Sequence, residues 1–132
     1  MGNYPRGFAP QSAGAFAAAR AMNLSDPDLQ TLLAATLAGQ SAATAVICLC
    51  ADWCDTCRDY RAVFDQAAAR HPALVFRWLD IEDEADALGD VDVPTFPTLL
   101  IGNARAPRFA GPVLPQAAHL TRLLQSLGLE AK

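Results

Sequence analysis

Residues 49–60 read LCADWCDTCRDY, and they join an apolar strand to a helix that carries two cysteines. The strand is TAVICLC at 44–50, a continuous run rich in branched residues, which is typical of a strand covered on both faces. After Cys54 the apolar spacing becomes helical up to residue 71, with one face formed by Tyr60, Phe64, Ala67 and Ala68. The two cysteines of the CxxC motif are therefore expected at a strand-to-helix junction.

A further helix precedes this junction. Ser25 or Asp26 is its predicted N-cap, Pro27 lies in its first turn, and Gly39 follows its end. Its buried stripe has helical spacing and consists of Leu29, Leu32, Leu33, Thr36 and Leu37.

Strands and helices continue after the junction. In order, we expect a strand at 73–81, a short acidic helix at 82–89, a strand at 98–101, an edge strand at 107–110 running up to Gly111, and a helix at 115–128 with a core stripe of Leu120, Leu123, Leu124 and Leu127. Helices alternate with strands first, and two strands then adjoin before the last helix. This order predicts an α/β fold, with a mixed sheet sandwiched by helices.

The composition favours one globular domain. A chain of 132 residues can bury a real core, and 52% hydrophobic with 18% charged residues excludes a disordered chain. The net charge of -4 argues against partners such as nucleic acid or an anionic membrane. No apolar run reaches the length of a membrane helix, and the start shows no secretory signal, so we expect a cytoplasmic protein. Residues 1–22 are interpreted as an N-terminal extension, with a short helix over 13–22.

All four cysteines fall between positions 48 and 57. A secreted disulfide scaffold would distribute its cysteines along the chain, whereas this clustering favours redox chemistry or a metal. A structural zinc site over the four cysteines is the metal alternative. It is the less favoured one, because zinc motifs present each cysteine pair from a turn and the chain has no second CxxC.

The CxxC spacing suits thiol–disulfide exchange. Cys54 would lie at the N-terminus of the helix, where unpaired N–H groups and the helix dipole stabilise a thiolate. This thiolate attacks a substrate disulfide, and the thiol of Cys57, one turn later, resolves the mixed disulfide within the chain. Cys54 is therefore expected to be the accessible thiol and Cys57 the shielded one.

Two motifs give a resemblance to a known family. ADWCDTC at 51–57 resembles the WCxxC active site of the thioredoxin family, and TFPTLLI at 95–101 resembles the loop in which that family places a cis-proline facing the disulfide. The motifs occur in the family's order, and Gly111 lies where the family commonly has a glycine. The resemblance implies a thioredoxin-like three-layer α/β/α sandwich with a central mixed β-sheet, which we assign to residues 23–132.

The resemblance also implies roles for site residues. Cys54 would be the attacking thiol, Cys57 the resolving thiol, and the Phe96–Pro97 bond the cis peptide, an isomer that only X–Pro bonds adopt at modest cost. The expected site comprises the catalytic Cys54 and Cys57 and, flanking them, Trp53, Asp55, Thr56, Phe96 and Pro97.

The chain departs from the family's pattern around these motifs. Cys48 stands where a thioredoxin usually buries an Asp as proton acceptor, and Cys50 stands where it usually has a tryptophan. The usual Gly-Pro between the cysteines is replaced by Asp and Thr, and Ala62 replaces the kink proline of the next helix. Because a buried cysteine is a poor base, we expect slow release of mixed disulfides at pH 7, unless water or a carboxylate such as Asp52 supplies the base.

Several nearby residues have simpler interpretations. Cys48 and Cys50 are expected to be small buried hydrophobic residues, and the alternative is that one of them exchanges with the active-site pair. The charge of Asp55 would oppose a thiolate at Cys54, and that of Arg58 would favour it. His71 and His119 look structural or solvent-facing. The acidic run at 80–92 lacks the ligand spacing and glycine of a calcium loop, so it is interpreted as a solvated face.

Together these features predict a thiol–disulfide oxidoreductase that exchanges a Cys54/Cys57 dithiol with disulfides of protein substrates. The alternative is a thioredoxin-like binding or assembly module without catalysis. We expect a monomer with no cofactor and no metal, whose partners are disulfide-containing proteins and an electron-donor reductase.

Overall fold

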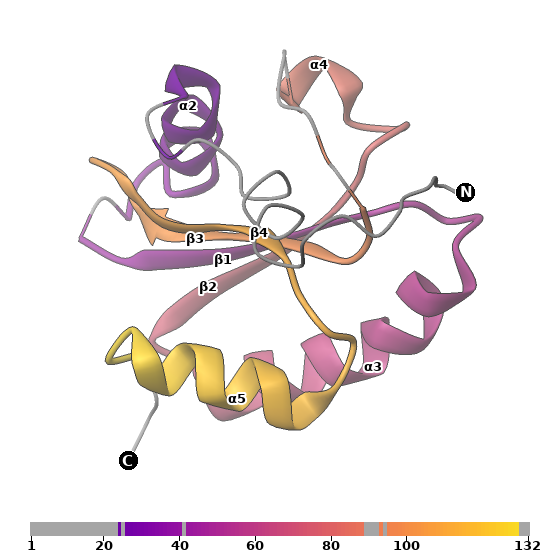
Figure 1. Cartoon of the computed structure of the whole chain (residues 1–132). Helices are drawn as coiled ribbons and strands as arrows, with labels where there is room; N and C mark the ends of the chain where they lie inside the picture. The colour runs from indigo at the N-terminus through magenta and orange to yellow at the C-terminus, as the bar shows by residue number, and fades with distance from the viewer. Residues whose placement is uncertain (1–23, 25, 41, 89–92, 94, 130–132) are drawn as a thin grey trace, which may run out of the picture.

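The structure is a computed structural model that describes residues 24, 26–40, 42–88, 93 and 95–129 (Figure 1). The predicted N-terminal extension and its helix, together with Ser25 and Gly89, lie outside the described residues. In chain order the elements are α2 (Pro27–Thr36), β1 (Thr44–Cys50), α3 (Asp55–Arg70), β2 (Leu74–Asp80), α4 (Ala85–Leu88), β3 (Thr98–Asn103), β4 (Pro107–Pro112) and α5 (Ala117–Ser126). None of the described helices has the length and apolar character needed to cross a membrane.

The four strands form one mixed sheet in the order β2-β1-β3-β4. β1 pairs in parallel with β2 and antiparallel with β3, and β3 pairs antiparallel with β4. β1 is therefore a central strand, and its last residue, Cys50, is opposite Asp80 at the end of β2. The predicted mixed sheet is confirmed, and β3 extends two residues beyond the predicted strand.

Helices cover both faces of the sheet, as predicted. α2 and α4 lie on one side, and α3 and α5 lie on the other (Figure 1). Successive residues of a strand point to opposite faces, so β1 contributes to two cores. Val46, Cys48 and Cys50 pack toward α3 and α5. The alternate residues Ala45, Ile47 and Leu49 pack toward α2 and α4.

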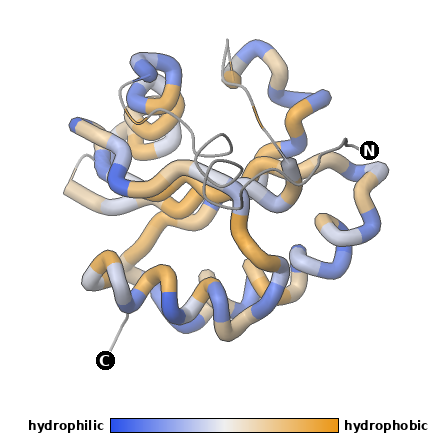
Figure 2. Tube along the Cα trace, in the orientation of Figure 1, coloured by the Kyte–Doolittle hydropathy of each residue, from blue (hydrophilic) through white to orange (hydrophobic). Residues whose placement is uncertain are grey.

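Most residues of the predicted helical stripes are buried, and the members that are only partly buried are Thr36, Ala68, Leu123 and Leu127. In α2 the leucines at 29, 32 and 33 are buried, and the Asp26 carboxylate accepts a hydrogen bond from the N–H of Asp28 at 2.9 Å, as its N-cap position predicts. In α3 the buried residues are Cys57, Tyr60, Phe64 and Ala67. Figure 2 shows apolar colours along the strands, whereas the helices alternate between polar and apolar colours. The core therefore lies in two layers, one on each side of the sheet.

Gly102 is the point at which the β3–β4 pairing shifts register. A Cβ atom there would lie 2.6 Å from the carbonyl oxygen of Ala106 and 2.7 Å from Cα of Pro107. Both neighbours are backbone atoms, so the loop between the two strands would have to move to admit a side chain.

We predict that Gly102→Ala lowers the free energy of unfolding by about 1–3 kcal/mol, because it overpacks a site enclosed by backbone. Urea unfolding of the variant and the wild type measures the effect. Gly111→Ala is the matched control, since its Cβ would meet only an ordinary contact, 3.8 Å from Cζ of Phe109. Equal stability of the Gly102 variant and this control would show that the loop adapts freely.

Candidate active site

Cys54 lies at the strand-to-helix junction, as predicted. It is the N-cap of α3 and has an extended backbone, with its N–H donating to Ala51 at 3.0 Å and its carbonyl accepting from Arg58 at 3.1 Å. Its thiol makes no capping hydrogen bond, is not in a disulfide and is partly exposed. Cys57, in the first turn of α3, is only 1% exposed. The expected contrast between an accessible Cys54 and a shielded Cys57 is thus present in the structure.

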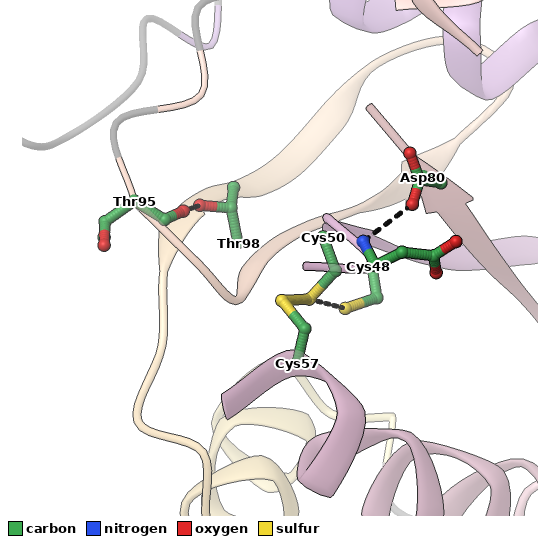
Figure 3. Close-up of a disulfide and its surroundings, with 7 residues drawn as sticks. Cys48, Cys50, Cys57, Asp80, Thr95 and Thr98 are labelled. Carbon is green, nitrogen blue, oxygen red and sulfur yellow. Dashed lines mark hydrogen bonds between the residues drawn. A yellow bond between two sulfur atoms is a disulfide. The ribbon is translucent and has the colours of Figure 1, made fainter. Parts of the chain in front are cut away.

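The disulfide of the structure joins Cys50 to Cys57 (Figure 3). The two Cα atoms are 5.8 Å apart, inside the range that a disulfide requires. Cys50 ends β1 on the face toward α3, and Cys57 is on the side of α3 that faces the sheet. The prediction of Cys50 as a simple core residue is therefore wrong, and the alternative, exchange with the active-site pair, has structural support. The catalytic assignment of Cys54 and Cys57 stays a prediction.

Cys48 lies beside this disulfide and is fully buried. Its Sγ is 3.7 Å from Sγ of Cys50, and since a disulfide sulfur carries no hydrogen, the Cys48 thiol is the donor. Burial raises the pKa of the Cys48 thiol far above its usual value, and the nearby charge of Arg61 only partly opposes this shift. Cys48 is thus the buried residue that the sequence predicted, and it is a protonated thiol at neutral pH.

Tyr60, on α3, belongs to the same buried cluster as Cys48 and the disulfide. Its hydroxyl is buried and has no hydrogen-bond partner within the described part of the chain. Burial raises the pKa of Tyr60, and the proximity of Cys48 raises it further. The Cys50–Cys57 disulfide therefore lies among groups that stay neutral. None of Cys48, Tyr60 and the disulfide can act as a base there.

An aromatic surface lies next to Cys54. The ring of Trp53 is 61% exposed and packs edge-to-face on Phe96, with ring centroids 5.6 Å apart. Its indole N–H donates to the carboxylate of Glu82 at 3.0 Å. Phe96 and Cys54 both pack against the core cluster that contains the disulfide. These contacts bring together the two motifs that are far apart in the sequence.

The loop at 95–98 brings Pro97 to this region. The Phe96–Pro97 peptide bond is cis, the isomer that the resemblance implied, and Pro97 is buried. The carbonyl of Pro97 accepts the N–H of Val113 at 3.0 Å, and the hydroxyl of Thr98 donates to the carbonyl of Thr95 (Figure 3). The loop is thus fixed from both ends by hydrogen bonds.

The charged residues after Cys54 neutralise each other. Asp55 and Arg58 form an ion pair one turn apart, and both side chains are well exposed. The two charges for which the sequence predicted opposing effects on Cys54 are thus paired with each other. Thr56, between the two cysteines, is exposed on the side of α3 that faces solvent.

Asp80 fixes the loop that leads into the site. Its carboxylate accepts the N–H groups of Asp52 at 2.8 Å, Glu82 at 2.8 Å and Asp83 at 3.2 Å, and the first of these bonds is drawn in Figure 3. Partial burial raises the pKa of Asp80, but these three donors outweigh it, so the pKa lies below its usual value of 3.8. One side chain therefore holds both the turn before Cys54 and the turn that carries Glu82, the partner of Trp53.

Metal binding has little support in this arrangement. The disulfide uses two of the four sulfur atoms, so a four-cysteine zinc site cannot form while it is present. The carboxylates of Asp52, Asp80 and Asp83 lie within 4.8 Å of one another, but Asp80 already accepts three backbone hydrogen bonds. Its oxygens thus already hold the two loops in place.

Comparison with known proteins agrees with this fold. The family model described as thioredoxin matches residues 30–122. A curated protein of Streptomyces coelicolor, "Putative thioredoxin 2", is 35% identical over 69 residues, which are 52% of this chain and 52% of that protein. The chain thus matches about half the length of this curated relative.

Solved structures share the fold. The oxidised thioredoxin of Plasmodium falciparum superposes with a TM-score of 0.58 at 12% identity, over 82% of this chain and 97% of that one. Thioredoxin O1 of Arabidopsis thaliana, in its oxidised state, gives a TM-score of 0.59 at 18% identity, over 70% of this chain and 85% of that one. At these identities the likeness establishes the three-layer fold.

We predict that Asp80→Ala destabilises the protein at pH 7 and that the difference from wild type shrinks in acid. The folded pKa of Asp80 is depressed, so its contribution is fully present above the unfolded value near 3.8 and is lost as the pH falls through the lower folded value. Unfolding free energies at pH 7 and at decreasing pH test this. Asp86→Ala, which removes an exposed acid from α4, is the control. A difference that does not change with pH would contradict the role of the ionised carboxylate.

Proposed function

The chain belongs to the thioredoxin family, and from this premise we propose that it is a thiol–disulfide oxidoreductase acting on disulfides of protein substrates. In the proposed reaction the Cys54 thiolate attacks a substrate disulfide and forms a mixed disulfide. The Cys57 thiolate then attacks the Cys54 sulfur and releases the reduced substrate, leaving a Cys54–Cys57 disulfide. One disulfide is reduced and one is formed.

The observation that carries this proposal is the placement of the sulfur atoms at the start of α3. Cys54 is partly exposed at the N-cap, where the first N–H groups of a 16-residue helix favour an anion. The N-cap and N3 positions of a helix lie within side-chain reach of each other, and Cys57 occupies N3. Cys57 already takes part in a disulfide, which supports its use as a redox-active thiol.

The surface around Cys54 supports a protein substrate. The exposed ring of Trp53 and the partly exposed ring of Phe96 form an aromatic face beside the thiol. Leu114, which is 55% exposed, follows Val113, whose N–H donates to the carbonyl of Pro97. An apolar face of this kind fits the side chains of an extended polypeptide better than a small polar disulfide.

Turnover as a reductase requires an external electron donor, because one dithiol supplies only two electrons. We propose a reductase partner that returns the disulfide to the dithiol, and a cytoplasmic site of action. The clustering of the cysteines and the acidic chain support this setting.

We predict that the wild-type chain accelerates the reduction of insulin by dithiothreitol and that Cys54→Ser abolishes this acceleration. The serine hydroxyl is not ionised at neutral pH, so the first attack cannot occur. Turbidity from the precipitating insulin B chain measures the rate. Acceleration that persists in Cys54→Ser would refute the assigned nucleophile. No acceleration in the wild type would favour the alternative, a binding module without catalysis.

A second prediction concerns the pH dependence of release. Resolution needs a thiolate at Cys57, and the Cys48 thiol, whose pKa is raised by burial, cannot take the proton at pH 7. We expect the single-turnover release of substrate to quicken as the pH rises from 7 to 9. Cys48→Asp, if folded by circular dichroism, should be faster than wild type at pH 7. A rate independent of pH in the wild type would show that proton removal from Cys57 is not limiting.

A further inference from the structure

The disulfide between Cys50 and Cys57 is not the bond that the proposed reaction leaves behind. A Cys54–Cys57 bond is the direct product of resolution, whereas in the structure Cys57 is bonded to Cys50 and Cys54 is a free thiol. Cys57 therefore lies between two sulfur partners. Cys54 is on its outer side at the surface, and Cys50 is on its inner side in the core.

We propose that Cys50 is a third redox-active cysteine, which takes the disulfide over from Cys54 and moves it into the core. The proposal extends the function proposed above and rests on it. After a substrate has been reduced, the chain would pass through the Cys54–Cys57 form and come to rest in the Cys50–Cys57 form.

The step is a thiol–disulfide exchange within the chain. The Cys50 thiolate attacks Sγ of Cys57, a Cys50–Cys57 bond forms, the Cys54–Cys57 bond breaks, and Cys54 leaves as a thiolate. The proton that Cys50 loses ends on Cys54 or in the solvent. One disulfide replaces another, so the step needs no further oxidant or reductant.

Cys48 is placed to assist this step. Its protonated thiol donates to Sγ of Cys50 at 3.7 Å, and the same contact would stabilise a thiolate on Cys50 before the attack. The leaving group is favoured as well, because Cys54 at the N-cap returns to the positive end of the α3 dipole. Both effects favour transfer of the disulfide from Cys54 to Cys50.

The transfer changes what the oxidised protein presents to its partners. A Cys54–Cys57 disulfide is exposed to a reductase at the surface, whereas a Cys50–Cys57 disulfide is covered, both residues being at most 1% exposed. The oxidised chain would keep a partly exposed Cys54 thiol that can still attack a second disulfide. A second attack at Cys54 would form a mixed disulfide that Cys57 cannot resolve until the core disulfide is reduced.

The sequence allows a direct test by peptide mapping. Cleavage before aspartate places Cys48 and Cys50 in peptide 28–51, Cys54 in peptide 52–54 and Cys57 in peptide 55–58. The reduced chain is oxidised with one equivalent of diamide, quenched in acid with N-ethylmaleimide, digested with endoproteinase Asp-N and analysed by mass spectrometry.

We expect peptide 28–51 linked to peptide 55–58, with peptide 52–54 carrying the maleimide. A bond confined to peptides 52–54 and 55–58 would overturn the proposal, as would the absence of any disulfide. In a quenched time course after mixing with insulin, the 52–54 to 55–58 link should appear first and then decline as the inner link grows. Inner links that never replace the outer ones would also overturn it.

Two matched variants identify the sulfur in peptide 28–51. Cys50→Ala should shift the entire bond to peptides 52–54 and 55–58, and Cys48→Ala should keep the inner link, although both replace fully buried cysteines of β1. Maleimide labelling of the native oxidised protein should modify Cys54 in the wild type and lose that modification in Cys50→Ala. An inner link that survives in Cys50→Ala would assign the exchange to Cys48 and refute the role of Cys50.

Failure of this inference and failure of the proposed function have different signatures. If insulin reduction depends on Cys54 but mapping shows only the outer disulfide, the function stands and the inner transfer does not occur. If the inner disulfide forms but insulin reduction is not accelerated, the function fails, and the transfer as a catalytic step fails with it.

Discussion

The burial of β1 on both faces determines where every sulfur atom of the site lies. All residues from Ala45 to Cys50 have no exposed surface, and the alternation of a strand sends Cys48 and Cys50 to the same side. That side is the one that α3 covers, and the chain enters α3 only four residues after the strand ends. In this arrangement the first inward residue of the helix, Cys57, lies against the last inward residue of the strand, Cys50.

Periodicity in the sequence was sufficient to predict most of the helices and strands and a mixed sheet between helices, whereas the thioredoxin-like three-layer arrangement was implied by the resemblance of two motifs. The continuous apolar run of β1, the leucine stripe of α2 and the cap at Asp26 each correspond to a local physical rule, and each is present in the structure. The pairing of Cys50 with Cys57 follows from no local rule, because it depends on the angle between β1 and α3. Alternation along a strand places Cys48 and Cys50 on one face, but it does not indicate which of the two cysteines α3 approaches.

The residues that hold the loops of the site, Asp80 and Glu82, were likewise not predicted from the sequence. Asp80 and Glu82 belong to an acidic run that composition alone assigns to solvent, yet one holds the turn before Cys54 and the other holds the indole of Trp53. Their partners lie 28 and 29 residues away in the sequence. Parallel pairing of β1 with β2 brings them together, since Cys50 and Asp80 end the two strands side by side. The loops at this end of the sheet are thus positioned by the sheet register.

The location of the disulfide can be understood from the cost of burying charge. In the chain-entropy model, a disulfide destabilises the unfolded chain by closing a loop. The loops from 50 to 57 and from 54 to 57 differ in this destabilisation by less than about 1 kcal/mol. Chain entropy therefore does not choose between the two bonds, and the folded environment does. A disulfide is neutral and needs no hydrogen bond, so it suits the core between β1 and α3. A thiol that must ionise suits the N-cap of α3, where solvent and unpaired N–H groups are at hand. Placing the bond at Cys50 and the free thiol at Cys54 meets both requirements at once, whereas the opposite placement would leave a second thiol in the core beside that of Cys48 and no free thiol at the N-cap.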